Sequence, residues 1–299
     1  MIVSIGEILA DMIGKKAEKS VQFECFAGGA PFNVACGVAK LGGKVKFVGC
    51  VGKDEIGDFL KEYAASVVGL ESDIHTVKER NTTLAFVTLS ESGERSFSFF
   101  RKNTADYALD VSAAEASVRE ADIVHIGSLM LSEKEGRAFA EKVAAYAKSL
   151  KKKISFDVNF REDIFAGREE AKSVYAPWLE RADILKLSEE EAEMFFGEDR
   201  EVRLTKLSVG RKIFVTLGKK GAELYENGIC TQCKTVDVRV IDTNGAGDAF
   251  YAGALRQIDG GERDGMKILR YANVCGALAT TKHGATEALP GESEVKKYL

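Results

Sequence analysis

The chain has 299 residues, of which 45% are hydrophobic and 29% charged, an ordinary composition for a globular protein. A net charge of −4 argues against a non-specific nucleic-acid binder, which needs a basic surface. Nothing approaches the run of about 18 apolar residues that a membrane span needs, and the start has neither the basic segment nor the cleavage site of a secretory signal, so we expect a cytoplasmic protein.

The first third of the chain alternates strands with helices and then changes pattern. Apolar strands and helices of regular spacing are predicted in turn at 2–9, 31–42, 44–51 and 54–68. Residues 83–90 and 95–101 then alternate apolar and polar side chains, and Glu91 to Glu94 supply a turn between them. That arrangement predicts a β-hairpin.

From residue 112 onward strands and helices alternate strictly. The strands are predicted at 122–127, 154–158, 183–187 and 212–217, the helices at 133–149, 168–181 and 189–196, and a further hairpin at 222–235. This alternation is typical of βαβ units, so we expect an α/β fold in which a mostly parallel sheet lies between two layers of helices. No linker divides the chain, which predicts a single domain over 1–299.

A small β lid is expected in addition to the sheet. The hairpin and the polar stretch before the first helix, about 11–26 and 83–103, interrupt an otherwise regular β/α series. Open α/β sheets bind their ligands at the carboxyl edge of the strands. A lid over that edge would exclude water from a reaction.

The segment Asp242-Thr-Asn-Gly-Ala-Gly-Asp248 carries the most chemical information. A strand predicted at 236–241 leads into it, and a helix predicted at 249–258 leaves it. Glycines let the backbone approach a ligand, and the N–H groups of a helix start bind anions such as phosphate. Asp248 would repel a bound phosphate, but it is well placed to accept a proton from an attacking hydroxyl.

Two other glycine motifs are excluded by the sequence. A dinucleotide-binding fingerprint would need glycine or alanine where Phe250 stands, and no Gly-Lys-Ser/Thr of a Walker A loop occurs. A helix-capping role for Asp248 stays open on spacing alone.

Cys230 and Cys233 have the spacing of half a zinc site or of a redox pair. A zinc site would need further ligands, and the only histidines are His75, His125 and His283. We therefore expect free thiols at both positions.

Two sequence motifs, one near each end of the chain, together resemble a known family. The chain resembles the ribokinase-like (phosphofructokinase-B type) sugar kinases at both of the family's signatures. The amino-terminal signature is matched by residues 28–35 (Gly-Gly-Ala-Pro-Phe-Asn-Val-Ala), followed by Leu41-Gly42, Val51-Gly52 and Asp54 to Gly57. The carboxyl-terminal signature is matched by the turn at 242–248. The resemblance runs over essentially the whole chain, with the motifs in family order. It implies the three-layer α/β/α sandwich and β lid of that family.

The resemblance also implies an ATP-dependent kinase and assigns roles at its active site. Asp248 would be the general base, and the amides of Gly245, Ala246 and Gly247 would stabilise the transferring phosphoryl group. ATP is expected at Ser188, Thr216, Gly218, Gly221 and Asn273, and the magnesium shell at Glu191.

Some of these positions keep another interpretation. Ser188 replaces the family's usual asparagine, and Asn273 could equally be a polar residue on an exposed helix. Asn244 replaces the commoner threonine or valine beside a monovalent-cation site of some members, so a potassium requirement stays open.

A neutral sugar is recognised by planar arrays of donors and acceptors. The expected sugar-binding residues are Asp11, Gly28, Gly29, Asn33, Phe97, Phe99, Arg101, Asn159 and Arg161. Phe97, Phe99 and Arg101 fall on one face of the hairpin by the two-residue period, although a plain apolar underside of the lid would give the same two phenylalanines.

The substrate is predicted from the lid. The Phe-Phe-Arg…Ala-Asp pattern over 99–106 is similar to the fructokinase and 2-keto-3-deoxygluconate kinase branches. Asp11 would repel an acid substrate, so we predict conversion of D-fructose to fructose 6-phosphate, with 2-keto-3-deoxygluconate or another ketose or nucleoside as the alternative. A non-catalytic sugar sensor would not need the intact Gly-Ala-Gly-Asp turn. An exposed lid edge further predicts a homodimer.

Overall fold

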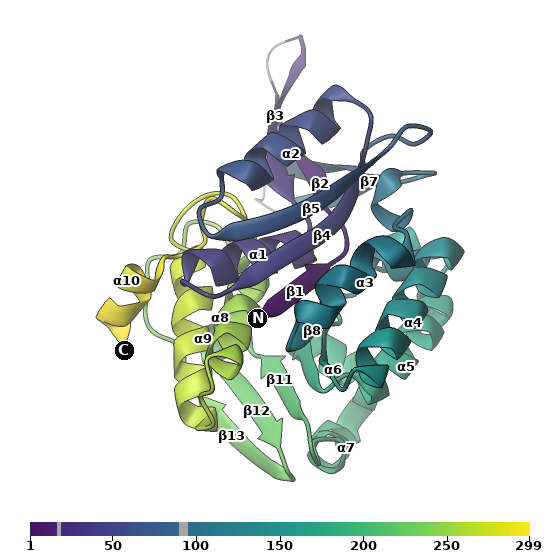
Figure 1. Ribbon diagram of the computed structural model, residues 1–299. Helices are drawn as coiled ribbons and strands as arrows, with labels where there is room; N and C mark the ends of the chain where they lie inside the picture. The colour runs from purple at the N-terminus through teal and green to yellow at the C-terminus, as the bar shows by residue number, and fades with distance from the viewer. Residues whose placement is uncertain (17–18, 90–94) are drawn as a thin grey trace.

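In the computed structural model, which describes residues 1–16, 19–89 and 95–299, a large sheet forms the centre of the molecule (Figure 1). Within the described residues it has nine strands in the order β13-β12-β11-β10-β9-β8-β1-β4-β5. The strands from β5 to β11 in that order are parallel, and β12 and β13 are antiparallel. Their bounds are β1 (Ile2–Ile5), β4 (Val45–Gly52), β5 (Leu70–Val77), β8 (Ile123–Ile126), β9 (Lys153–Asp157), β10 (Ile184–Ser188), β11 (Lys212–Thr216), β12 (Ala222–Glu226) and β13 (Ile229–Cys233).

Helices cover both faces of this sheet (Figure 1). One face carries α1 (Ala30–Lys40), α2 (Glu55–Ser66), α8 (Ala246–Asp259) and α9 (Gly265–Ala279), and α10 (Glu292–Val295) packs against α9. The other face carries α3 (Val111–Glu120), α4 (Lys134–Ser149), α5 (Arg168–Arg181), α6 (Glu189–Phe196) and α7 (Arg200–Leu207). The predicted α/β fold with a mostly parallel sheet is confirmed.

Alternation along the buried strands explains the two helix layers. Successive side chains of a strand point to opposite faces, so Ile2 belongs to the core beneath α1 and α8, whereas Val3 and Ile5 belong to the core beneath α3 and α4. Parallel strands covered on both faces are apolar throughout. A charged residue within such a strand therefore stands out.

A second, four-stranded sheet lies beside the large one. Its strands, in the order β3 (Val21–Gly28), β2 (Leu9–Lys16), β6 (Leu84–Leu89) and β7 (Arg95–Phe100), are antiparallel except for the pair β2–β6. We call it the lid sheet. The turn predicted at 91–94 lies outside the described residues.

The strand predicted at 236–241 is wrong. The chain there pairs with no strand of the described residues. Instead the N–H groups of Ile241 and Asp242 donate to the carbonyl of Thr280, just after α9. The segment reads as apolar because it borders a cleft, as described below, and not because it joins a sheet.

No helix in the described ranges is both long and apolar enough to cross a membrane.

Candidate active site

Two clefts open at the carboxyl edge of the large sheet and meet at one turn. The polar cleft, of about 330 Å³, is lined by residues that include Glu7, Asp11, Gly29, Asn33, Phe99, Asn159, Arg161, Lys186, Asn244, Gly245 and Asp248. The apolar cleft, of about 480 Å³, is lined by residues that include Thr216, Gly218, Gly221, Val236, Val238, Phe250, Asn273 and Ala277. Thr243 and Gly247 line both. A group on this turn can therefore act on ligands in either cleft.

The turn passes directly into α8. Gly245 adopts a left-handed conformation with a φ of 72°, and a Cβ there would lie 3.1 Å from the Cα of Ala285. Glycine is the residue that fits such a position without strain. The first N–H groups of α8 have no partner within the helix, and they coincide with its positive dipole end. Gly245, Ala246 and Gly247 thus lie where backbone amides can bind a phosphoryl group.

Asp248 occupies the first turn of α8 and faces the polar cleft. The side-chain amide of Asn33, at the start of α1, donates to its Oδ2 over 2.8 Å. Burial raises the pKa of Asp248 to about 6, and the Asp157 carboxylate acts in the same direction, against the Asn33 hydrogen bond and the positive charges of Lys186 and Arg161. Asp248 is therefore a stronger base than an ordinary aspartate and still ionised at neutral pH.

Asp11 projects into the polar cleft from β2 of the lid sheet. On the neighbouring strand, a Cβ at Gly28 would lie 2.4 Å from Asp11 Oδ2, so glycine at position 28 makes room for the carboxylate. Gly29 has a φ of 110°, and a Cβ there would lie 2.5 Å from the carbonyl of Glu7. The two glycines let the chain pass close to the cleft while Asp11 keeps its place.

The remaining residues predicted to bind sugar divide into three groups. Phe99, Asn159 and Arg161 line the polar cleft with Asp11 and Asn33. The side chain of Phe97 lies outside the part of the chain that is described. Arg101 is not among the residues that line the cleft.

Arg101 instead forms a buried ion pair. Its Nε and one terminal nitrogen donate to Asp106 Oδ2 over 2.8 and 2.6 Å, and the other terminal nitrogen donates to Ser132. The Arg101 and Asp106 side chains are 4% and 0% exposed. Arg101 follows the exposed Phe100 and turns inward, where Asp106 and not a ligand satisfies its guanidinium group. Strand periodicity could not reveal this partner, because β7 ends at Phe100.

We expect Arg101→Ala to lower the free energy of unfolding by about 3–5 kcal/mol, because it leaves the Asp106 carboxylate buried without its cation. Urea denaturation would measure this. Arg137→Ala, which removes an exposed pair with Glu170, is the matched control and should cost less than about 1 kcal/mol. Unchanged stability together with a raised KM for the sugar would instead make Arg101 a substrate ligand.

Two residues of the polar cleft escaped the sequence analysis. Glu7 follows β1 and is 1% exposed, and burial raises its pKa to about 8, so that it is mostly neutral at pH 7. Lys186, on β10, is also buried. Each has a charged side chain within or just after an otherwise apolar parallel strand. A charged residue in such an apolar run is the sequence feature that could have identified both.

The residues predicted to bind nucleotide mostly border the apolar cleft. Thr216 is the last residue of β11, Gly218 and Gly221 come from the turn that follows it, and Asn273 comes from α9. The Asn273 amide donates to the carbonyl of Cys233 over 2.9 Å, which ties α9 to the chain after β13.

Ser188 and Glu191 lie outside both sets of lining residues. They form a capping box at the start of α6, in which Glu191 Oε2 accepts from the Ser188 N–H over 2.7 Å. Glu191 Oε1 accepts from the Phe160 N–H over 2.6 Å. The described residues contain no group of three or more Asp, Glu, His or Cys side chains that could hold a metal ion. A divalent metal at this site would depend chiefly on the phosphates of a nucleotide, as Mg²⁺ commonly does.

Cys230 and Cys233 both lie on β13, and all six cysteines are free. Residues three apart on a strand point to opposite faces. Accordingly Cys230 is exposed, whereas Cys233 packs against the core beneath α9. The two thiols cannot converge on one ion without moving the strand.

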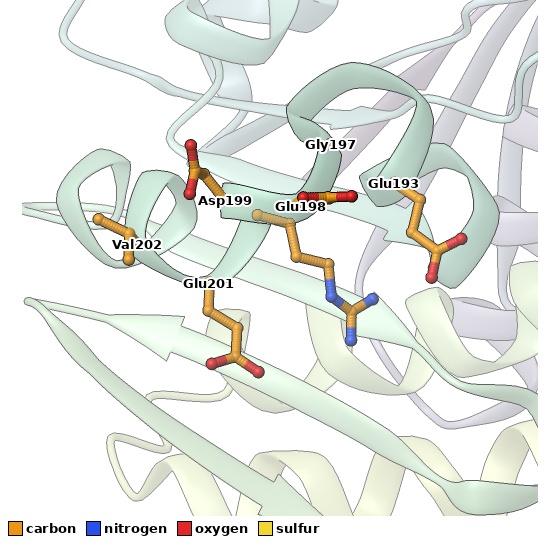
Figure 2. A pocket seen from close by; sticks show the side chains of 7 residues that line it. Glu193, Gly197, Glu198, Asp199, Glu201 and Val202 are labelled. Carbon is orange, nitrogen blue, oxygen red and sulfur yellow. The ribbon is translucent and has the colours of Figure 1, made fainter.

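A third hollow lies away from this turn. It is formed by Glu193, Gly197, Glu198, Asp199, Arg200, Glu201 and Val202 at the junction of α6 and α7 (Figure 2). Four of these side chains are carboxylates, which repel phosphate. It shares no residue with the two clefts and has no part in the chemistry described above.

The sequence and the fold match known sugar kinases. The family model of the pfkB family carbohydrate kinase matches residues 1–292. A probable fructokinase-2 of Arabidopsis thaliana is 36% identical, and the match covers all of this chain and 95% of the relative. The structure of a fructokinase with bound ATP from Xylella fastidiosa superposes with a TM-score of 0.91 at 33% identity, covering 99% of this chain and 97% of that one.

A fructokinase double mutant from Vibrio cholerae, with fructose, ADP and potassium bound, superposes with a TM-score of 0.89 at 29% identity, covering 100% of this chain and 97% of that one. The family match extends over nearly the whole chain, and it agrees with an apolar cleft and a polar cleft that share the turn before α8. The chain belongs to the pfkB family of carbohydrate kinases.

Proposed function

We propose that this kinase transfers the γ-phosphoryl group of ATP to D-fructose and forms fructose 6-phosphate, with Asp248 as the general base. The observation that carries the proposal is the shared turn at 243–247, which borders both clefts and is followed directly by Asp248. ATP would occupy the apolar cleft, because its walls are apolar and its inner end is the anion-binding start of α8. Fructose would occupy the polar cleft beneath the lid sheet.

The reaction follows from this placement. Asp248 accepts the proton of the fructose 6-hydroxyl as its oxygen forms a bond to the γ-phosphorus. The bond between that phosphorus and the β–γ bridging oxygen breaks, and ADP leaves. The amides at 245–247 stabilise the charge on the phosphoryl oxygens during transfer. The lid sheet would limit the access of water, which is the competing acceptor.

Mg²⁺ is expected to enter with ATP and to neutralise its phosphates. Glu191 fits an indirect role best, since backbone amides occupy both of its carboxylate oxygens. The potassium in the V. cholerae relative makes K⁺ a second candidate ion for the turn at 242–244. Asp242 Oδ1 already accepts from the Asn244 N–H there over 2.8 Å, so a cation would act on a preformed turn.

Fructose is favoured over an acid sugar by the charges of the polar cleft. Asp11 and Asp248 both face it, and a substrate carboxylate would be repelled by them. Of the two lining cations, Lys186 gives two of its three N–H groups to Asp157, so Arg161 has more donors to offer a substrate carboxylate among the described lining residues. The relatives named fructokinase support the same choice.

A sugar panel tests the proposal. ADP release would be followed with fructose, 2-keto-3-deoxygluconate, ribose, adenosine and fructose 6-phosphate, each with Mg²⁺ and with either K⁺ or Na⁺. The proposal predicts the highest kcat/KM for fructose. A higher value for 2-keto-3-deoxygluconate would overturn the substrate assignment but leave the kinase activity and Asp248 in place.

We also propose that the protein is a homodimer joined through the lid sheet. The rings of Phe23 and Phe86 lie 5.0 Å apart and those of Phe86 and Phe100 lie 4.9 Å apart, on the face of the lid sheet opposite Asp11 and Phe99. Phe100 is 62% exposed and Val21 51%. A second copy would cover this aromatic face. Sedimentation analysis should give a dimer that Phe100→Ser weakens, and a monomeric wild type would contradict the proposal.

We also propose that the protein is cytoplasmic. It is supported by six cysteines that are all free, because free thiols persist in reducing compartments.

A further inference from the structure

Lys186 is a buried cation in the centre of the large sheet. It lies on β10 directly opposite Asp157 of β9 in the strand register. Its Nζ donates to Asp157 Oδ1 over 2.9 Å and to Oδ2 over 2.8 Å. The two side chains are 8% and 4% exposed. Two of the three ammonium N–H groups are therefore taken by one carboxylate.

Stability alone is a poor reason for this pair. Its neighbours Leu185 and Leu187 are buried apolar residues, as expected of a parallel strand covered on both faces. Burying two charges is costly even when they are paired, and apolar side chains of similar volume often serve as well or better. Asp157 is the last residue of β9 and Lys186 lines the polar cleft, which points to a role for the pair in the cleft.

The ammonium group lies beside the phosphate-binding turn. Lys186 lines the polar cleft together with Gly247 and Asp248. A Cβ built at Gly247 would lie 3.3 Å from Lys186 Nζ, so the missing side chain of this glycine leaves the space between the ammonium and the turn open. Because Gly247 also borders the apolar cleft, a phosphoryl group that passes between the clefts must pass this place.

A cation next to the turn would offset the negative charge in the polar cleft. The carboxyl groups of Asp11 and Asp248 line it together with Glu7, whose raised pKa keeps it mostly neutral at pH 7, and the phosphoryl group brings further negative charge. Arg161 is the other lining cation, and one of its terminal nitrogens donates to the carbonyl of Phe160 over 3.1 Å. Among the described residues, Lys186 is thus the lining cation that lies next to the turn itself.

We propose that Lys186 is a catalytic residue whose ammonium group, held in place by Asp157, contacts the oxygens of the transferring phosphoryl group and neutralises charge that develops on them. Asp157 is then a positioning residue. The proposal rests on the kinase function given above and adds a side-chain donor to the backbone amides of 245–247. Fixed donors of this kind act mainly on the transition state, so their loss lowers kcat more than it raises KM.

The test compares Lys186→Met, Asp157→Asn and the double variant, with whichever sugar the wild type phosphorylates best. Lys186→Met should lower kcat by about 10²- to 10³-fold, the cost of losing one transition-state donor. The KM for ATP and for the sugar should change by less than about threefold, since ground-state binding is largely kept. Circular dichroism and thermal melting would establish that each variant is folded.

The double variant separates catalysis from structure. If Lys186 only neutralises Asp157, removing both charges should restore kcat to within about threefold of the wild type. If Lys186 contacts the phosphoryl group, the double variant should stay as slow as Lys186→Met, and Asp157→Asn alone should retain more activity than either. A recovered double variant, or Lys186→Met with at least a third of the wild-type kcat, overturns the proposal. A wild type that phosphorylates no sugar overturns the proposed function instead.

The pH dependence of kcat/KM gives a further test, because it would not change if Lys186 and Asp157 had a purely structural role. Asp248 is faced by Asn33, Asp157, Lys186 and Arg161, and by the buried Glu7, which is mostly neutral below its pKa of about 8. The Lys186 charge lowers the pKa of Asp248, whereas the Asp157 charge raises it. The acid limb of kcat/KM should therefore move to higher pH in Lys186→Met and to lower pH in Asp157→Asn. Equal shifts in one direction, or none, would contradict the placement of Lys186 next to the base.

Discussion

The Asp248→Asn variant is expected to phosphorylate fructose at least about a hundredfold more slowly than the wild type, which is the scale of losing a positioned general base. Asparagine has the size of aspartate and can still accept the hydrogen bond from Asn33, which now spans 2.8 Å, but it cannot take up a proton. The amides of 245–247 remain, so ATP binding should be nearly unchanged. Steady-state kcat and calorimetric titration with ATP would measure the two quantities.

The pH dependence gives this prediction its control. Burial raises the pKa of Asp248 to about 6, and the base works only when it is ionised. The kcat/KM of the wild type should therefore fall as the pH drops below about 6, and the residual activity of Asp248→Asn should lack this acid limb. Near-normal turnover in Asp248→Asn would exclude Asp248 as the general base.

A large effect on sugar binding is expected from Gly28→Ala. The added Cβ would lie 2.4 Å from Asp11 Oδ2, closer than two such atoms can approach, so the Asp11 carboxylate must move. Misplacing the carboxylate that we expect to bind the sugar hydroxyls should raise the KM for fructose by about tenfold or more, because hydrogen bonds that involve a charged group contribute about 1.5–3 kcal/mol each. The KM for ATP should hardly change, since no residue of β3 lines the apolar cleft.

A double-mutant cycle with Asp11→Ala identifies the cause. If the alanine at position 28 acts through Asp11, the variant with both changes should bind fructose no worse than Asp11→Ala alone. Effects that add would mean that Gly28→Ala distorts the lid sheet independently of Asp11. In that case Asp11 would lose its support as the sugar ligand.

The regular part of the fold was predictable because it follows two simple periods. Buried strands such as the one ending at Ile126 and helices such as that over 134–149 show apolar patterns that need no knowledge of the rest of the molecule. The edge strand β5 was missed, because Leu70–Val77 carries exposed polar residues that hide the pattern. At 236–241 the opposite error occurred, and a strand was predicted where none forms. The residues that line the apolar cleft there are as apolar as those of a buried strand.

The site was predictable where a motif fixes the backbone. The turn at 242–248 and the glycines at 28 and 29 need particular residues for conformational reasons, so their sequence is informative. The roles of Arg101, Lys186 and Asp157 could not be predicted in this way, because they depend on which charged partner lies next to each side chain in the folded protein. Arg101 was expected in the cleft and is paired with Asp106, whereas Lys186 was overlooked and lies in the cleft. One charged residue among apolar ones signals that a partner exists but does not identify it.

The most direct test of the central claim is a crystal structure with fructose and a non-hydrolysable ATP analogue. The account predicts fructose in the polar cleft, with its 6-hydroxyl within hydrogen-bonding distance of Asp248. It also predicts the γ-phosphate analogue at the amides of 245–247, close to Lys186. A sugar bound elsewhere, or a nucleotide whose terminal phosphate lies away from this turn, would contradict it.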